Sequence, residues 1–112
     1  MDTIILQKTY HLYQWLDKII DSFLKRERYS LGVKLENHCL SLLEEIVTIE
    51  QVPPVLKDQS LIRASVKLQV LKLLVRLTME KKLIKPTVYF SLSSLMIEIG
   101  KMIGGWRKSL RK

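Results

Sequence analysis

The chain has 112 residues, which suffices for one domain with a hydrophobic core and is too short for two domains of ordinary size. Hydrophobic residues make up 47% and charged residues 27%, a globular composition that excludes intrinsic disorder and a membrane-spanning protein. The single cysteine, Cys39, excludes an intrachain disulfide, and the first residues lack the basic start of an export signal. We therefore expect one domain over residues 1–112 in a reducing cytoplasm.

The first half of the chain carries two helical patterns. From Thr3 to Leu24 apolar residues recur every three or four positions, which predicts a helix with a wide apolar face. The polar run 25–28 interrupts this pattern. A second apolar stripe predicts a helix over residues 27–51, which ends before Pro53-Pro54 because proline disfavours a helical residue before it.

The second half of the chain carries two more helical patterns. Asp58 or Ser60 is suited to cap a third helix whose apolar stripe ends near Thr78, and Pro86 suits the first turn of a fourth. We expect Gly104-Gly105 to weaken the final turns of that helix. Its predicted core residues repeat with nearly a heptad rhythm: Val88, Leu92, Leu95, Ile99, Met102 and Trp106. Four antiparallel helices with short connections predict an all-α, up-down four-helix bundle.

The third and fourth predicted helices each carry a second line of apolar residues. A small monomeric bundle needs only one core-facing stripe per helix, so the extra lines indicate self-association into a homo-oligomer. The residues that we assign to this interface are Val66, Val70, Leu73, Leu77, Tyr89, Met96 and Ile103.

Residues suited to catalysis are few. His38 and Cys39 are adjacent, so on a helix their side chains point about 100° apart and cannot act together as base and nucleophile. No glutamate lies three residues before either histidine, as a di-metal bundle requires, and no glycine-rich phosphate loop follows a strand. We therefore expect no enzyme activity, no metal and no cofactor, and we interpret Cys39 as a core thiol beside a boundary histidine.

Positive charge is concentrated at the helix junctions. The chain holds 19 Lys and Arg against 11 Asp and Glu, a net charge of +8 that favours an anionic partner. In an up-down bundle the first and third junctions lie at the same end, so their cations can converge on phosphate groups. The predicted nucleic-acid contacts are Lys25, Arg26, Arg28, Arg63, Lys67, Lys81, Lys82, Lys85, Lys101, Arg107 and Lys108.

The positive charge also allows other interpretations. The cations can instead form a solvated surface that keeps the protein soluble or docks an acidic protein. A membrane partner is not expected, because no helix carries a dense lysine face on the side opposite an exposed apolar face. Trp15, Trp106 and Phe23 occupy expected core positions, so nucleic-acid binding should rest on phosphate and shape rather than on base stacking.

Two segments carry a family resemblance. The strings Glu27-Arg28-Tyr29-Ser30-Leu31-Gly32-Val33-Lys34-Leu35-Glu36-Asn37 and Glu98-Ile99-Gly100-Lys101-Met102-Ile103-Gly104-Gly105-Trp106 resemble signatures of a small four-helix-bundle family. That family includes the accessory variability determinant (Avd) of diversity-generating retroelements and the proteins encoded in intervening sequences of bacterial 23S ribosomal RNA. Residues 10–23 also resemble its first helix, so the similarity covers nearly the whole chain.

The resemblance implies a basic homopentameric barrel that binds a reverse transcriptase and nucleic acid and is required for mutagenic copying of a template RNA during retrohoming. The protein itself would not be catalytic. Both branches of the family share these strings, so an intervening-sequence protein is the first alternative. A structural helical oligomer or protein adaptor without nucleic-acid binding is the second.

Overall fold

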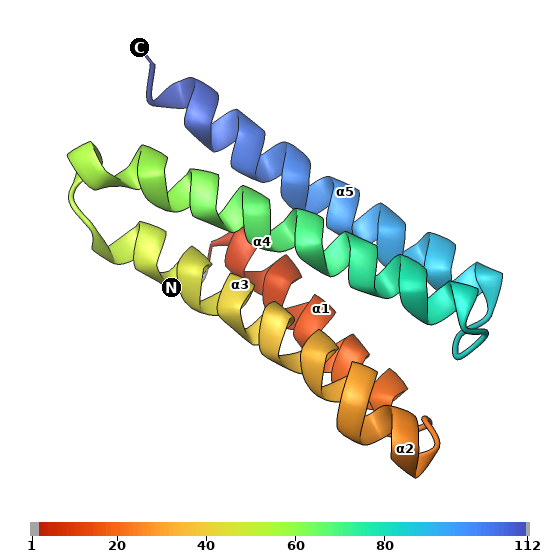
Figure 1. The fold of residues 1–112 in the computed structure, drawn as a ribbon. Coiled ribbons are helices and arrows are strands. Elements are labelled where there is room, and N and C mark those ends of the chain that lie inside the picture. The colour runs from red at the N-terminus through yellow and green to blue at the C-terminus, as the bar shows by residue number, and fades with distance from the viewer. Residues whose placement is uncertain (1–2, 112) are drawn as a thin grey trace.

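The computed structural model describes residues 3–111, which are helical apart from the turns between helices and the residues that flank the first and last helix. The elements in chain order are α1 (Ile4–Ile20), α2 (Lys25–Glu27), the π-helical turn η1 (Arg28–Gly32), α3 (Val33–Gln51), α4 (Pro54–Glu80) and α5 (Pro86–Ser109). Because α2, η1 and α3 follow one another without a break, the described chain forms four long helical segments (Figure 1).

The four long segments form an elongated bundle with extents of 47 × 23 × 22 Å. Helix α3 packs between α1 and α4, and α5 packs against both α4 and α1, so the contacts close a four-sided arrangement (Figure 1). Short turns join successive helices, as the predicted up-down topology requires. The prediction of an all-α helical bundle is confirmed for the single chain. None of the described helices is long and apolar enough to cross a membrane.

Proline and cap chemistry set the helix starts. Thr3 caps α1 by accepting a hydrogen bond from the Leu6 amide at 3.3 Å. Helix α5 begins at Pro86 as predicted. The predicted start of the third helix at Asp58 or Ser60 is wrong, because α4 begins at Pro54, whose fixed φ and missing N–H suit a first turn.

The end of α1 differs from the prediction, whereas α5 runs through its glycine pair. Helix α1 ends at Ile20 rather than Leu24, although Phe23 in the following turn still reaches the core with 3% of its surface exposed. Helix α5 continues through Gly104 and Gly105 to Ser109. The two glycines therefore do not interrupt the helix, because the tertiary contacts of its apolar face outweigh their weak helix propensity.

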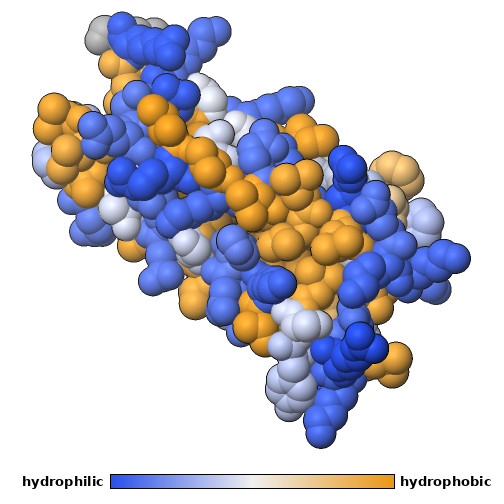
Figure 2. Space-filling view, in the orientation of Figure 1, coloured by the Kyte–Doolittle hydropathy of each residue, from blue (hydrophilic) through white to orange (hydrophobic). Residues whose placement is uncertain are grey.

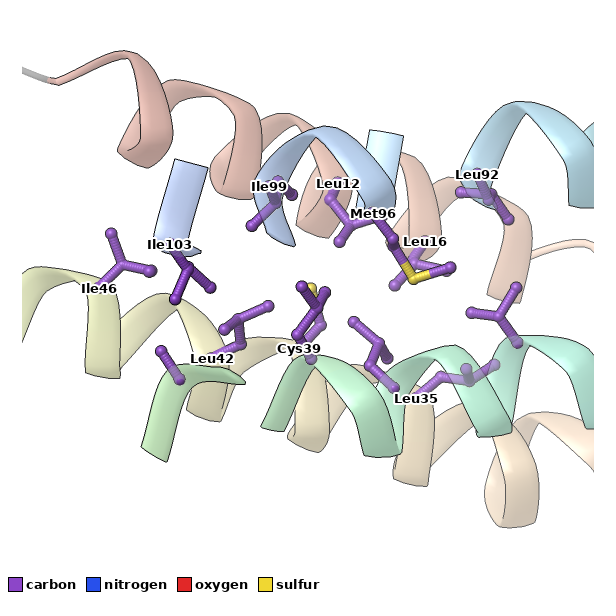
Figure 3. Close-up of a cluster of buried hydrophobic side chains, with 14 of the residues drawn as sticks. Leu12, Leu16, Leu35, Cys39, Leu42, Ile46, Leu92, Met96, Ile99 and Ile103 are labelled. Carbon is purple, nitrogen blue, oxygen red and sulfur yellow. The ribbon is translucent and has the colours of Figure 1, made fainter. Parts of the chain in front are cut away.

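The core fills the space between the helices with aliphatic side chains. Figure 3 shows Leu12 from α1, Leu35 and Leu42 from α3, and Leu92 and Ile99 from α5 pointing toward one another. Cys39 is fully buried among them, and this burial raises the pKa of its thiol to about 12, so it is not a nucleophile at neutral pH. Neighbouring His38 is half-buried, as predicted.

Helix α5 presents a different face to the core than the sequence predicts. Its buried line is Leu92, Met96, Ile99 and Ile103, whereas Val88, Leu95, Met102 and Trp106 are half-buried at the margin. Met96 and Ile103 are 1% and 2% exposed, so their assignment to the oligomer interface is wrong. The helix is apolar around most of its circumference, and only packing against α1 and α4 selects the buried line.

Candidate nucleic-acid interface

The two basic junctions lie at the same end of the bundle. The connection from α1 into α2 and the connection from α4 to α5 both lie at this end in Figure 1. An ion pair joins them directly, with Lys81 Nζ 2.9 Å from Glu27 Oε2. The convergence predicted from the up-down topology is therefore present, and we call the residues 25–28 and 81–85 the junction end.

The cations of the junction end differ in how far they are already engaged. Lys81 pairs with Glu27, and Arg28 Nη2 donates to the Phe23 carbonyl at 3.3 Å. The other cations of the junction end are exposed, and no ion pair within residues 3–111 involves them: Lys25, Arg26, Lys82 and Lys85. These charges remain available for an anionic ligand.

The turn after α4 fixes one of these cations in a strained backbone conformation. Lys82 has φ 62°, the left-handed region that usually favours glycine. The Lys82 amide donates to the Met79 carbonyl at 2.8 Å and the Leu83 amide donates to the Thr78 carbonyl at 3.0 Å, the hydrogen-bond pattern of a Schellman cap. A lysine at this position lowers the stability of the turn relative to glycine, and it adds a positive charge to the junction end.

The turn at η1 depends on a glycine. A Cβ added at Gly32 would lie 2.8 Å from Ile20 Cγ2, a methyl group of a buried β-branched side chain on α1. Gly32 is thus needed for the close approach of η1 to α1 at the junction end. Glu27 and Gly32, both in the first signature string, therefore act at the same junction.

The predicted phosphate contacts on α4 are held by a carboxylate instead. Glu45 on α3 is 7% exposed, and its Oε1 lies 3.3 Å from both Arg63 Nε and Lys67 Nζ. Arg63 Nη2 also donates to Ser60 Oγ at 2.9 Å. A buried carboxylate requires such partners, so Arg63 and Lys67 compensate its charge and align α3 with α4.

Glu45 was overlooked in the sequence, although a signal was present. It lies three residues after Leu42 and four before Ile49, on the apolar stripe of its helix. A glutamate at a core position needs a cation nearby. The position of Glu45 on this stripe therefore predicts that a cation such as Arg63 or Lys67 pairs with it instead of pointing into solvent.

The opposite end of the bundle is also basic, but there the carboxylate of Asp58 already binds Arg107. Arg107 Nε lies 2.9 Å from Asp58 Oδ1, and Arg107 Nη2 lies 3.5 Å from Oδ2. The hydrogen bond from Arg107, with the nearby charges of Arg107 and Arg111, lowers the pKa of Asp58. Lys101 and Lys108 are exposed on α5, away from the junction end.

An apolar stripe covers the outer face of α4, away from the core. Val66, Leu73 and Leu77 are 58%, 60% and 42% exposed, and Val70 beside them is half-buried. Figure 2 shows hydrophobic side chains gathered in a band along the visible face of this helix. We call these four residues, together with Ile62, the outer stripe. It retains the α4 half of the predicted oligomer interface.

The α5 half of that interface is reduced. Tyr89 is half-buried and packs edge to face against Phe90, with ring centroids 5.6 Å apart, and Phe90 itself is 64% exposed. Gly100 approaches α4, since a Cβ there would lie 3.4 Å from Leu68 Cδ2, whereas Gly104 faces open space. Of these two glycines, only Gly100 lies in close contact with a neighbouring helix.

Within residues 3–111 the structure contains no group of three or more His, Cys, Asp or Glu side chains placed to hold a metal. A wide, open hollow of about 660 Å³ lies along α1, with His11, Gln14, Trp15 and Lys18 among its lining residues. His11 and Trp15 lie with ring centroids 6.0 Å apart.

The fold and the charge distribution define a class of protein, a small, basic, all-α bundle with a cationic end. A protein-family model described as bAvd-like matches residues 3–110, and the chain therefore belongs to the bAvd-like family. A comparison with curated proteins finds no match. A comparison with solved structures finds none either.

Proposed function

We propose that this chain is a non-catalytic accessory protein of a diversity-generating retroelement, which binds the reverse transcriptase and its template RNA or DNA to support mutagenic retrohoming. The observation that carries the proposal is the junction end, where two basic connections far apart in the sequence meet through the Lys81–Glu27 pair. Membership in the bAvd-like family supports it.

The charge balance at the junction end suits an anionic ligand. Four cations there have no carboxylate partner in residues 3–111, so they are free to contact backbone phosphates, and membership in the bAvd-like family supports nucleic acid as the source of those phosphates. Binding of this kind releases counterions, so the affinity should fall steeply with added salt.

Self-association through the outer stripe is part of the proposal. Val66 and Leu73 leave more than half of their side chains in water in the single chain, and a second copy would cover them. Five copies at +8 each would carry a net charge of about +40. The electric field of such a charge attracts nucleic acid over a long distance. The number five follows from the family resemblance.

The test is RNA binding over a salt series, with native mass read from the same samples. We expect Lys25→Gln/Lys82→Gln/Lys85→Gln to weaken binding and to lower the slope of log affinity against log salt by roughly 2 to 3, because each lost phosphate contact removes about 0.7 to 0.9. The matched control is Lys34→Gln/Lys72→Gln/Arg111→Gln, which removes the same charge at positions outside the junction end that are not among the predicted contacts.

The outcomes separate the proposal from its alternatives. Equal losses for the two triple variants would show that net charge, not the junction end, drives binding. A stable oligomer without RNA affinity at low salt would favour a protein adaptor and contradict the proposal. A reverse-transcriptase gene beside the gene for this chain is the genomic arrangement that the proposal requires, and a position inside a 23S ribosomal RNA gene would indicate the intervening-sequence branch.

A further inference from the structure

An exposed aromatic residue directly follows the basic run 25–28 of the junction end. Tyr29 is in η1 and is 68% exposed. It follows Lys25 by four residues and Arg26 by three along a continuous helical segment, so it lies between these two cations around the helix. The aromatic residues considered for base stacking from the sequence are Trp15, Trp106 and Phe23, and Tyr29 is not among them. Its position directly after the basic run 25–28 was the available signal.

The other three tyrosines have structural roles that Tyr29 lacks. Tyr13 donates a hydrogen bond to Glu36 Oε1 at 3.2 Å. Tyr89 packs against Phe90 and the core, and Tyr10 lines an apolar hollow between α1 and α3. Within residues 3–111, Tyr29 makes no side-chain hydrogen bond and no aromatic or cation–π contact, and most of its surface is in solvent.

The backbone beneath Tyr29 is held firmly. Gly32 packs against Ile20, and Ser30 Oγ donates to the Arg26 carbonyl at 3.0 Å. The ring is therefore presented on a fixed helical turn, with few rotamers to lose when a flat ligand binds. Leu24 and Val33 nearby in sequence are 79% and 42% exposed, which adds apolar surface around it.

A flat ring among cations fits the two parts of a nucleotide. Aromatic side chains stack on bases of any sequence, while Lys and Arg bind the phosphates on either side. In a duplex the bases are already stacked on one another, so only unpaired bases are free to contact the ring.

We propose that Tyr29 is a stacking platform for an unpaired base of a single-stranded nucleic acid whose phosphates contact Lys25 and Arg26. The inference rests on the proposed nucleic-acid binding and adds to it a preference for single strands. It replaces the expectation of binding through phosphate and shape alone.

The test compares the wild type, Tyr29→Ala and Tyr29→Phe for binding to an unstructured 12-nucleotide RNA and to a 12-base-pair RNA duplex. We expect Tyr29→Ala to weaken single-strand binding by about 5- to 150-fold and duplex binding by less than about 2-fold. Tyr29→Phe should retain wild-type affinity, because stacking needs the ring and not the hydroxyl. The salt slope should be unchanged, since no phosphate contact is lost.

Tyr10→Ala is the matched control, because Tyr10 is 52% exposed on α1 and outside the junction end. It should leave single-strand affinity unchanged. The same 12-nucleotide sequence as DNA should respond to Tyr29→Ala as RNA does, because stacking does not read the 2′-hydroxyl. Native mass and thermal unfolding of each variant establish that fold and assembly are kept.

The results that would overturn the inference are distinct from those that would overturn the proposed function. Wild-type-like single-strand binding by Tyr29→Ala, or an equal loss on single strand and duplex, rejects the stacking role alone. A loss in Tyr29→Phe equal to that in Tyr29→Ala assigns the effect to the hydroxyl and also rejects stacking. A wild type that binds neither RNA overturns both proposals.

Discussion

The two ends of the bundle are both basic, yet they hold their charges differently. At the junction end, Glu27 engages Lys81 and leaves the neighbouring cations exposed. At the opposite end, Asp58 engages Arg107 in a two-bond contact, and Lys57 Nζ donates to the Ile49 carbonyl at 2.6 Å while lying 5.9 Å from the centre of the Trp106 ring. Both ends also keep exposed cations, such as Lys108 and Arg111 at the opposite end, so the difference lies in how many charges are already engaged.

The difference teaches that the availability of a charge depends on its neighbours in space. A cation that already contacts a carboxylate or a carbonyl must give up that contact to bind phosphate, and the exchange reduces the net gain. The aromatic residues follow the same division: Trp106 is packed against the core at one end, and Tyr29 is left in solvent at the other. The opposite end therefore commits more of its charged and aromatic side chains to internal contacts, and the junction end leaves more of them in solvent.

The largest expected effect compares these two aromatic residues. Trp106→Ala should lower the free energy of unfolding by about 2 to 3 kcal/mol, somewhat less than the ~3–5 kcal/mol of a fully buried ring, because Trp106 is half-buried. Tyr29→Ala should change it by less than about 0.5 kcal/mol. Urea unfolding measures both. Similar losses for the two variants would show that the ends do not divide stability and binding.

A second contrast uses a glycine from each end. Gly32→Ala should destabilise the protein by about 1 to 2 kcal/mol, because the new Cβ would lie 2.8 Å from Ile20 Cγ2. Gly104→Ala meets no atom within 4 Å and should stabilise it by about 0.5 to 1 kcal/mol through better helix propensity. Thermal unfolding of the two variants checks the opposite signs, and a stabilising Gly32→Ala would contradict the close approach of η1 to α1.

A third prediction concerns the strained turn of the junction end. Lys82→Gly should raise the free energy of unfolding by up to about 1 kcal/mol, because glycine adopts φ 62° without a Cβ clash. Lys82→Ala removes the same charge and keeps the strain, so it should give no such gain. RNA affinity should fall equally in both variants. A gain in Lys82→Ala would assign the effect to charge repulsion instead.

The smallest effect is the pH dependence of the opposite end. Because the native pKa of Asp58 lies below its ordinary value of 3.8, its contribution to stability is fully present well above pH 3.8 and is lost as the pH falls through the lower native pKa. NMR titration of the Asp58 carboxyl should show the low midpoint in the wild type. In Arg107→Gln the midpoint should return toward 3.8. An unmoved midpoint would show that Arg107 is not its cause.

Much of the fold was predictable because it depends on local patterns. Apolar periodicity predicted the four long helical segments, and Pro86 fixed the start of α5. Because successive antiparallel helices alternate in direction, the first and third junctions must lie at the same end. The signature strings predicted the family, which the match over residues 3–110 confirms. The presence of Cys39 in the core also followed from its stripe.

What the sequence alone determined is therefore the number and order of the helices and where positive charge is dense. Only the tertiary structure decided which line of α5 is buried, so that Met96 faces the core, and which cations are engaged. The physical reason is that local periodicity describes one helix at a time. Burial and ion pairing, as in Glu45 with Arg63 and Lys67, are settled between helices that meet only when the bundle forms.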